Sequence, residues 1–159
     1  MYADSTQRAS PQAQMQDIQP LPVRPGESRT PALQVLAEKR MHGGMPYLAV
    51  ATNAEISAET GRSFLKEASK AVASGTGKPE QYVMVRLNAG QPLLFAGTDA
   101  PTALLEVKSI GFPAHGVQGL AASLCRLVTE HLGVPGDRTY VVFTDVKAAM
   151  WGHDGEMFG

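Results

Sequence analysis

The pattern of hydrophobic and polar positions divides the chain near residue 46. Upstream of that point the residues are mainly Gln, Pro, Ser and Ala, and aromatic or β-branched side chains are few. A segment of this composition buries too little apolar surface to offset the entropy lost when its backbone becomes ordered. We therefore expect residues 1–45 to form a disordered or non-native extension, with a short helix possible around residues 32–40, and residues 46–159 to form one domain.

Within residues 46–159, four apolar runs of strand length alternate with two helical patterns. Runs of this length that are flanked by Gly and Pro are typical of buried strands. The predicted strands are residues 46–51, 82–87, 103–110 and 139–144.

Each predicted helix carries its apolar residues at a spacing of three or four, which places them on one face. The stripe of the first helix contains Phe64, Leu65, Ala68 and Val72, and that of the second contains Leu120, Ala121, Leu124, Leu127, Val128 and Leu132. Ser57 is a suitable N-cap for the first helix. Glycines followed by prolines end both helices, at residues 77–79 and 133–135.

The order strand, helix, strand occurs twice, with corresponding positions 56 residues apart. This order predicts an α+β fold in which two βαβ pseudo-repeats form a four-stranded mixed sheet with two helices on one face. The strands are apolar enough that we expect the opposite face to be as apolar as the first. Association of subunits is then the simplest way to cover it.

Charge and cysteine content exclude several classes of function. The net charge is -1, so the chain offers no basic surface for a nucleic-acid backbone. The single cysteine, Cys125, excludes an intrachain disulfide and zinc motifs built on paired thiolates. The histidines lack metal-ligand spacing, and no apolar run approaches the roughly 20 residues that span a membrane. We expect no metal, no nucleic-acid partner, no membrane partner and a cytoplasmic location.

Four short motifs point to a known family. They are Met45-Pro46, Thr76-Gly77-Lys78-Pro79, Lys108-Ser109-Ile110-Gly111 and Pro135-Gly136-Asp137-Arg138-Thr139-Tyr140. In this order and spacing they resemble the macrophage migration inhibitory factor branch of the tautomerase superfamily, from Pro46 to the C-terminus. The resemblance implies a homotrimer and a keto-enol tautomerase that acts on phenylpyruvate-like 2-oxo acids without a cofactor. Family members without a signal peptide also leave cells by non-classical routes, so secretion is an alternative location.

The resemblance gives Pro46 the role of catalytic base, which requires that it be the N-terminal residue. A free α-amino group titrates near pH 7.7–8.0, and burial or a nearby cation lowers its pKa. We expect Tyr47, Ile110 and Val142 to supply apolar surroundings for the amine. Lys78 is the expected cation, which binds the substrate carboxylate or polarises the site. Its alternative role is that of a solvated loop lysine.

The remaining site residues also come from the resemblance. It implies that the backbone of Ile110, next to Ser109, contacts the ligand, and that Tyr140 lines the site of a neighbouring subunit. The alternatives are an ordinary strand end for Ser109 and Ile110 and a core aromatic for Tyr140.

The chain departs from the family pattern in three respects. Val142 stands where the animal proteins have an asparagine, and His153 stands where the family has a pocket tryptophan, with Trp151 two residues earlier. The Cys-x-x-Cys of the animal cytokine falls on residues 102–105, which contain no cysteine, so we expect no thiol oxidoreductase activity.

A second function is possible with the same fold. If residues 1–45 stay attached, the nitrogen of Pro46 is an imide without a basic lone pair. The protein would then be a cytokine-like binding protein without catalysis, with an unknown receptor.

Overall fold

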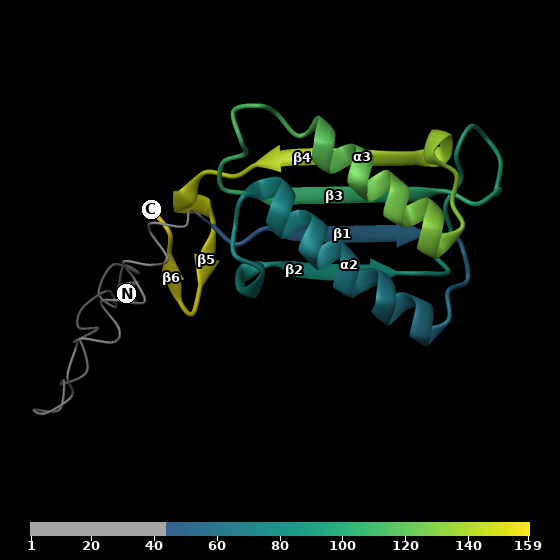
Figure 1. The fold of residues 1–159 in the computed structure, drawn as a ribbon, viewed down its shortest axis with the longest axis horizontal. Helices are drawn as coiled ribbons and strands as arrows, with labels where there is room; N and C mark the ends of the chain where they lie inside the picture. Colours follow the sequence, from purple (N-terminus) through teal and green to yellow (C-terminus); the bar gives the residue numbers. More distant parts are fainter. Residues whose placement is uncertain (1–43) are drawn as a thin grey trace, which may run out of the picture.

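The computed structural model describes residues 44–159, so the predictions for residues 1–43 lie outside the described part of the chain. Its main elements are β1 (Tyr47–Thr52), α2 (Ala58–Thr76), β2 (Met84–Asn88), β3 (Ala103–Ser109), α3 (Gln118–Leu127) and β4 (Thr139–Asp145) (Figure 1). The shorter elements are the 3-10 helices η2 (Glu80–Tyr82), η4 (Gly136–Arg138) and η5 (Ala148–Met150), the π-helical turn η3 (Val128–Leu132), and the strands β5 (Gly152–His153) and β6 (Glu156–Met157).

The four long strands form one mixed sheet in the order β2-β1-β3-β4. Strand β1 runs parallel to β2, strand β3 runs parallel to β4, and the central pair β1 and β3 is antiparallel. Each parallel pair is joined through a helix, α2 in the first unit and α3 in the second. The predicted mixed sheet of two βαβ pseudo-repeats is therefore confirmed.

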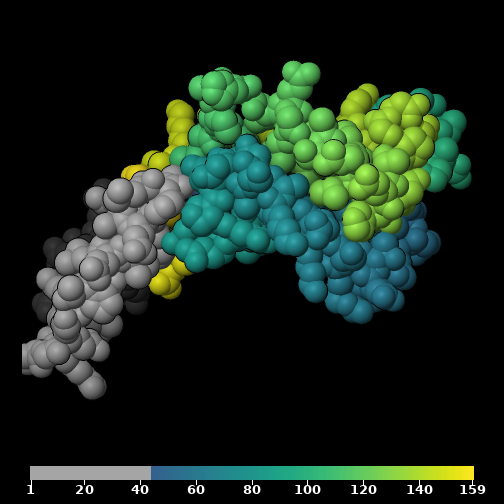
Figure 2. Space-filling view, viewed as in Figure 1, coloured from purple at the N-terminus to yellow at the C-terminus, as the bar shows by residue number. Residues whose placement is uncertain are grey.

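Both helices cover the same face of the sheet (Figures 1 and 2). The apolar stripes predicted from the sequence supply the helical half of the core, in which Phe64, Ala68, Val72, Leu124 and Val128 are fully buried. The strands contribute every second side chain, as their alternating burial shows. Leu48, Val50, Leu105 and Val107 complete this core.

The uncovered face of the sheet is less apolar than the sequence predicts. Arg86, Glu106 and Lys108 project from it, and the Lys108 ammonium lies 3.9 Å from the Glu106 carboxylate. Strands alternate side chains between two faces, so charged residues inside an apolar run reach the outer face. The same face exposes the large apolar or aromatic side chains of Met84, Tyr140 and Val142.

Two local features also differ from the sequence-based expectation. Tyr82 closes a 3-10 turn and does not open the second strand, which begins at Met84. The C-terminal hairpin of β5 and β6 was not predicted, because strands of two residues carry no periodic signal. Its turn is formed by Asp154 and Gly155, both with positive φ.

Among the described residues, no helix has the length and apolar character needed to cross a bilayer.

Candidate functional site

A helix-ending motif places Lys78 at one end of the sheet. Gly77 adopts a left-handed conformation with φ 68°, and its N–H donates to the carbonyl of Ser74. The N–H of Lys78 donates to the carbonyl of Ala73 at 3.0 Å, which completes a Schellman motif. Pro79 then opens the turn that leads into β2. The backbone of Lys78 is thereby fixed where helix α2 ends and β2 approaches β1.

Pro46 lies at the same end of the sheet, immediately before β1. It is fully buried, and its carbonyl accepts the N–H of Met84 at 2.9 Å. The β1–β3 register pairs Tyr47 with Lys108, so one step further along Pro46 stands opposite Ser109. Ile110 follows directly. The fold therefore brings Pro46, Ser109 and Ile110 together from two neighbouring strands.

The upstream chain packs onto Ile110. Gly44 is buried with φ +71°, and a Cβ atom added to it would lie 2.5 Å from the Ile110 side chain. Any larger residue at this position would overlap Ile110. While Gly44 and Met45 remain attached to Pro46, Gly44 therefore fills the space beside Ile110.

Lys78 reaches this cluster with its charged end. Its Nζ donates to the carbonyl oxygen of Ile110 at 3.3 Å. Burial lowers the pKa of Lys78 from its ordinary value, and the negative charge of Asp145 partly opposes this shift. A partly desolvated ammonium next to Ile110 is suited to pair with an anion, because its charge is poorly screened by water.

Asp145 is a residue that sequence reasoning missed. It ends β4 in register with Ser109, and its Oδ1 accepts the N–H of Gly111 at 2.9 Å. The carboxylate thereby fixes the backbone that follows Ile110, and it also influences the pKa of Lys78. Its position directly after the predicted fourth strand was the available signal.

Ser109 differs from its neighbours in its hydrogen bonding. Its side chain is buried, and within the described residues its hydroxyl has no hydrogen-bond partner.

Tyr47 lies on the uncovered face of the sheet, in register with Met84 and Lys108, and is half-buried. Pro46, Tyr47, Lys78, Ser109 and Ile110 therefore gather at one end of the sheet.

Tyr140 and Val142 lie elsewhere. Tyr140 stands opposite Leu104, which stands opposite Ala51. Ala51 lies five residue steps along the chain from Pro46, a distance of about 17 Å in an extended strand. Val142 is also exposed on the outer face, and it is separated from β1 by the whole width of β3. One chain therefore does not place Val142 beside Pro46, contrary to the expectation from the sequence.

The C-terminal hairpin lies beyond the end of the sheet at which β1 begins (Figure 1). Trp151 directly precedes this hairpin, and its carbonyl accepts the N–H of Phe158 at 3.0 Å. His153 belongs to β5 and is exposed.

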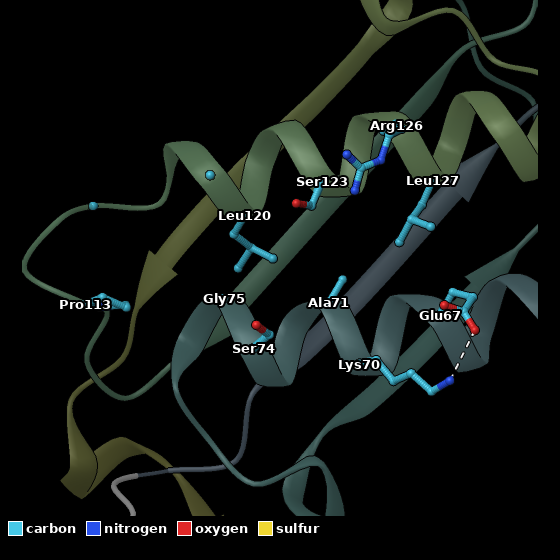
Figure 3. Close-up of a pocket in the computed structure, with 12 residues that line it drawn as sticks. Glu67, Lys70, Ala71, Ser74, Gly75, Pro113, Leu120, Ser123, Arg126 and Leu127 are labelled. Carbon is cyan, nitrogen blue, oxygen red and sulfur yellow. Dashed lines mark hydrogen bonds and ion pairs between the residues drawn. The ribbon is translucent and has the colours of Figure 1, made fainter.

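A separate groove of about 500 Å³ runs between α2 and α3 (Figure 3). Its lining combines small and polar side chains with Leu120 and Leu127, and it includes a Glu67–Lys70 ion pair at 3.2 Å and Arg126 on the facing helix. None of the predicted site residues lines it. Within residues 44–159, no three His, Cys, Asp or Glu side chains are grouped so that they could hold a metal ion.

Comparison with known proteins identifies the family. The family described as macrophage migration inhibitory factor (MIF) matches residues 45–159. A macrophage migration inhibitory factor homolog from Brugia malayi is 37% identical over 116 residues, which cover 72% of this chain and 100% of that protein. One from Trichuris trichiura is 39% identical over 119 residues, with coverage of 72% and 100%. The solved structure of a homologue from Prochlorococcus marinus is 38% identical and has a TM-score of 0.68, with coverage of 71% of this chain and 99% of that one. The chain belongs to the macrophage migration inhibitory factor family.

Proposed function

We propose that the protein is a keto-enol tautomerase of phenylpyruvate-like 2-oxo acids, with the amine of a free N-terminal Pro46 as catalytic base. The observation that supports this proposal most strongly is the gathering of Pro46, Ile110 and Lys78 at one end of the sheet. A buried amine and a partly desolvated cation suit a reaction that moves a proton beside a carbonyl.

The reaction needs no oxidant and no second substrate. The Pro46 nitrogen takes a proton from the carbon next to the ketone, and the electron pair of that C–H bond forms the carbon–carbon double bond of the enol. The carbonyl π electrons move to oxygen, which then receives the proton. Lys78 pairs with the substrate carboxylate, and its charge also favours the neutral form of the Pro46 amine.

Pro46 can act as the base only if residues 1–45 are absent from the active protein, because its nitrogen must be a free amine. Two findings support this requirement. The family match begins at Met45, directly before Pro46, and two relatives are covered over their whole length by only 72% of this chain. Gly44 also packs on Ile110, so the attached segment fills space that a ligand of that backbone would need.

A homotrimer completes the proposed site. Tyr140 and Val142 lie too far from Pro46 to act with it in one chain, but they are exposed on the uncovered face of the sheet. In a trimer the Tyr140 of one subunit would line the site of its neighbour, as the family resemblance implies. Val142 supplies no hydrogen bond at a position where the animal proteins have an asparagine, so we expect altered substrate preference.

We propose a cytoplasmic location.

The test compares two forms of the protein. One begins at Met45, so that removal of the methionine leaves Pro46 as the N-terminus, and the other is the full chain. Residues of this shorter form correspond to 99% of a solved homologue, which supports folding without the upstream segment. The form that begins at Pro46 should tautomerise phenylpyruvate at least about 100-fold faster, because general-base catalysis contributes roughly 10²–10⁴-fold. Equal rates would reject the proposal, and mass spectrometry should verify both N-termini.

The alternative is a cytokine-like binding protein in which the upstream segment stays attached. The packing of the buried Gly44 on Ile110 is the observation that favours it, because the attached segment has a fitted place on the domain. The Met45–Pro46 peptide bond then keeps the Pro46 nitrogen an imide. Mass spectrometry of the protein from its native source distinguishes the two, since a mass that includes residues 1–45 supports the binding protein.

A further inference from the structure

The loop between β2 and β3 is fastened to the start of β4 by one arginine. The guanidinium of Arg138 donates to the carbonyls of Pro101 and Ala100, both at 2.9 Å, and more weakly to those of Phe95 and Thr98 at 3.3 and 3.4 Å. The planar guanidinium can bind several acceptors at once from one fixed position. These bonds hold a loop in which Phe95 and Thr98 form an isolated β-bridge.

The backbone of Arg138 is itself held in place. Its carbonyl accepts the hydroxyl of Thr102 at 2.7 Å, and Thr102 is buried. The N–H of Thr102 in turn donates to Oδ1 of Asn53 at 2.8 Å. Arg138 is thus anchored next to the start of β3 and the end of β1, and the loop that it fastens has a fixed position relative to the sheet.

Arg138 also contacts the ring of Phe95, which in turn contacts the ring of Tyr140. The guanidinium carbon of Arg138 lies 5.1 Å from the centre of the Phe95 ring, and the Phe95 and Tyr140 rings lie 5.1 Å apart at an angle of 59°. Tyr140 is 63% exposed, and within the described residues its hydroxyl has no hydrogen-bond partner. The contact with Phe95 is therefore a structural constraint on the direction of the Tyr140 ring.

We propose that Arg138 and Phe95 are positioning residues that fix the ring of Tyr140 for contact with an aromatic substrate bound at a neighbouring subunit. This inference rests on the proposed function. A tyrosine ring held in one rotamer loses little conformational entropy when it stacks on a ligand, so fixing it favours binding. The pair acts on affinity and on the preference for aromatic 2-oxo acids, and it leaves the proton transfer at Pro46 unchanged.

The pseudo-repeat supports a dedicated role for this pair. At the equivalent positions 56 residues earlier, Tyr82 stands in place of Arg138, and Met84 stands in place of Tyr140. The backbone is the same in both units, with a 3-10 turn followed by a strand. The fold alone therefore does not require an arginine and an aromatic ring at these two positions.

The experiment separates the ring contact from the fastening of the loop. Phe95→Leu removes the ring and keeps the backbone carbonyl that Arg138 binds, so the variant should fold. In the full chain, three-bond couplings of the Tyr140 side chain should report one χ1 rotamer for the wild type and averaging for Phe95→Leu. Arg138→Lys should give the same averaging. Leu94→Ala in the same loop and Arg126→Lys on the surface of α3 are the controls, and both should leave the couplings unchanged.

Kinetics of the form that begins at Pro46 supply the functional readout. Phe95→Leu should raise KM for phenylpyruvate about three- to tenfold with kcat within about twofold, which corresponds to the strength of an aromatic contact. In a Tyr140→Leu background, Phe95→Leu should have no further effect, because it acts through that ring.

Unchanged couplings in Phe95→Leu would overturn the positioning role, as would an equal rise of KM in both backgrounds. Absence of activity in the wild type would reject the proposed function instead. The couplings would then still decide whether Arg138 and Phe95 orient Tyr140.

Discussion

The two ends of the sheet are built on the same backbone plan but carry different residues. The pseudo-repeat relates Pro46 to Thr102 and Lys78 to Val134, and both helices end on glycines with φ 68°. Val134 is fully buried, whereas Lys78 is half-buried and binds a carbonyl. The fold thus offers two equivalent places for a site, and this sequence puts groups suited to acid–base chemistry at only one.

The second end uses its polar groups for structure. Thr102 donates from its hydroxyl to Arg138 and from its backbone N–H to Asn53. Asn53 donates to the carbonyl of Asp99 at 2.8 Å. At the first end, by contrast, the hydroxyl of Ser109 is unpaired among the described residues, and the Lys78 ammonium makes one long hydrogen bond. Buried polar groups without a partner are rare in folded proteins, and a catalytic role is one explanation for them.

Removing the base should give the largest effect. In the form that begins at Pro46, Pro46→Gly should lower the rate of phenylpyruvate tautomerisation about 100-fold or more, because the amine is the proposed base. The matched control is Thr102→Ser at the equivalent position of the other end, which keeps its hydroxyl and should change the rate less than about twofold. Enol-to-keto conversion followed by ultraviolet absorbance measures both. Comparable losses in the two variants would contradict a site located at one end only.

Making the two ends alike should destabilise the protein. Val134→Lys places an ammonium where the native side chain is fully buried, so the free energy of unfolding should fall by about 3 kcal/mol or more. Urea unfolding followed by circular dichroism measures the loss. The reciprocal variant Lys78→Val should keep its stability and lose substrate affinity. A Val134→Lys protein as stable as the wild type would show that the two ends are more alike than their burial indicates.

Removing one bond at the structural end should have a moderate effect. Thr102→Val keeps the shape of the side chain and leaves the carbonyl of Arg138 without its buried donor, which should cost about 1–3 kcal/mol of unfolding free energy. Thr98→Val, which removes an exposed hydroxyl, is the control and should stay within about 0.5 kcal/mol of the wild type. Thermal unfolding distinguishes the two, and equal stabilities would contradict a structural role for Thr102.

The smallest effect concerns pH. Burial lowers the pKa of Lys78 in the folded state, so the unfolded chain binds more protons between that lowered pKa and 10.5. The contribution of Lys78 to stability therefore rises with pH across this window, and below the window the burial of its charge opposes folding. The melting temperature of Lys78→Met, relative to the wild type, should be highest near neutral pH and should decline toward pH 10.5. A difference independent of pH would contradict the lowered pKa.

Substrate affinity should fall with rising pH, whereas the contribution of Lys78 to stability rises. The ammonium of Lys78 is needed to pair with a carboxylate, so KM should rise as pH increases through the lowered pKa. Lys78→Arg keeps its charge throughout this range and should abolish that alkaline rise.

The fold could be predicted from the sequence because local signals agreed with each other. The apolar stripe around Phe64 and the one around Leu124 fix two helices, and the glycines at positions 77 and 133 end them. The repetition of these signals after 56 residues then predicts two βαβ units in one sheet. The hairpin of β5 and β6 could not be predicted, because its strands are two residues long and its turn depends on two positive φ angles.

The candidate site could be predicted only in part. Motif spacing identified Pro46, Lys78 and Ile110, which the fold gathers at one end. The expected neighbourhood of Val142 was wrong within one chain, because sequence order does not reveal how many strands separate two residues. Arg138 and Phe95 were not recognised as partners of Tyr140, since their contacts depend on the path of a loop without regular structure.

The surroundings of Gly44 limit which residues evolution can place at this position. Its positive φ and its contact with Ile110 exclude any side chain while the upstream segment remains attached in this arrangement. If that segment is cut away at maturation, selection on the glycine disappears, because the residue leaves with the segment. An alignment of close homologues that carry the same extension would therefore show whether the segment is kept or removed. A glycine retained at this position indicates that the extension persists, and free variation indicates that it is discarded.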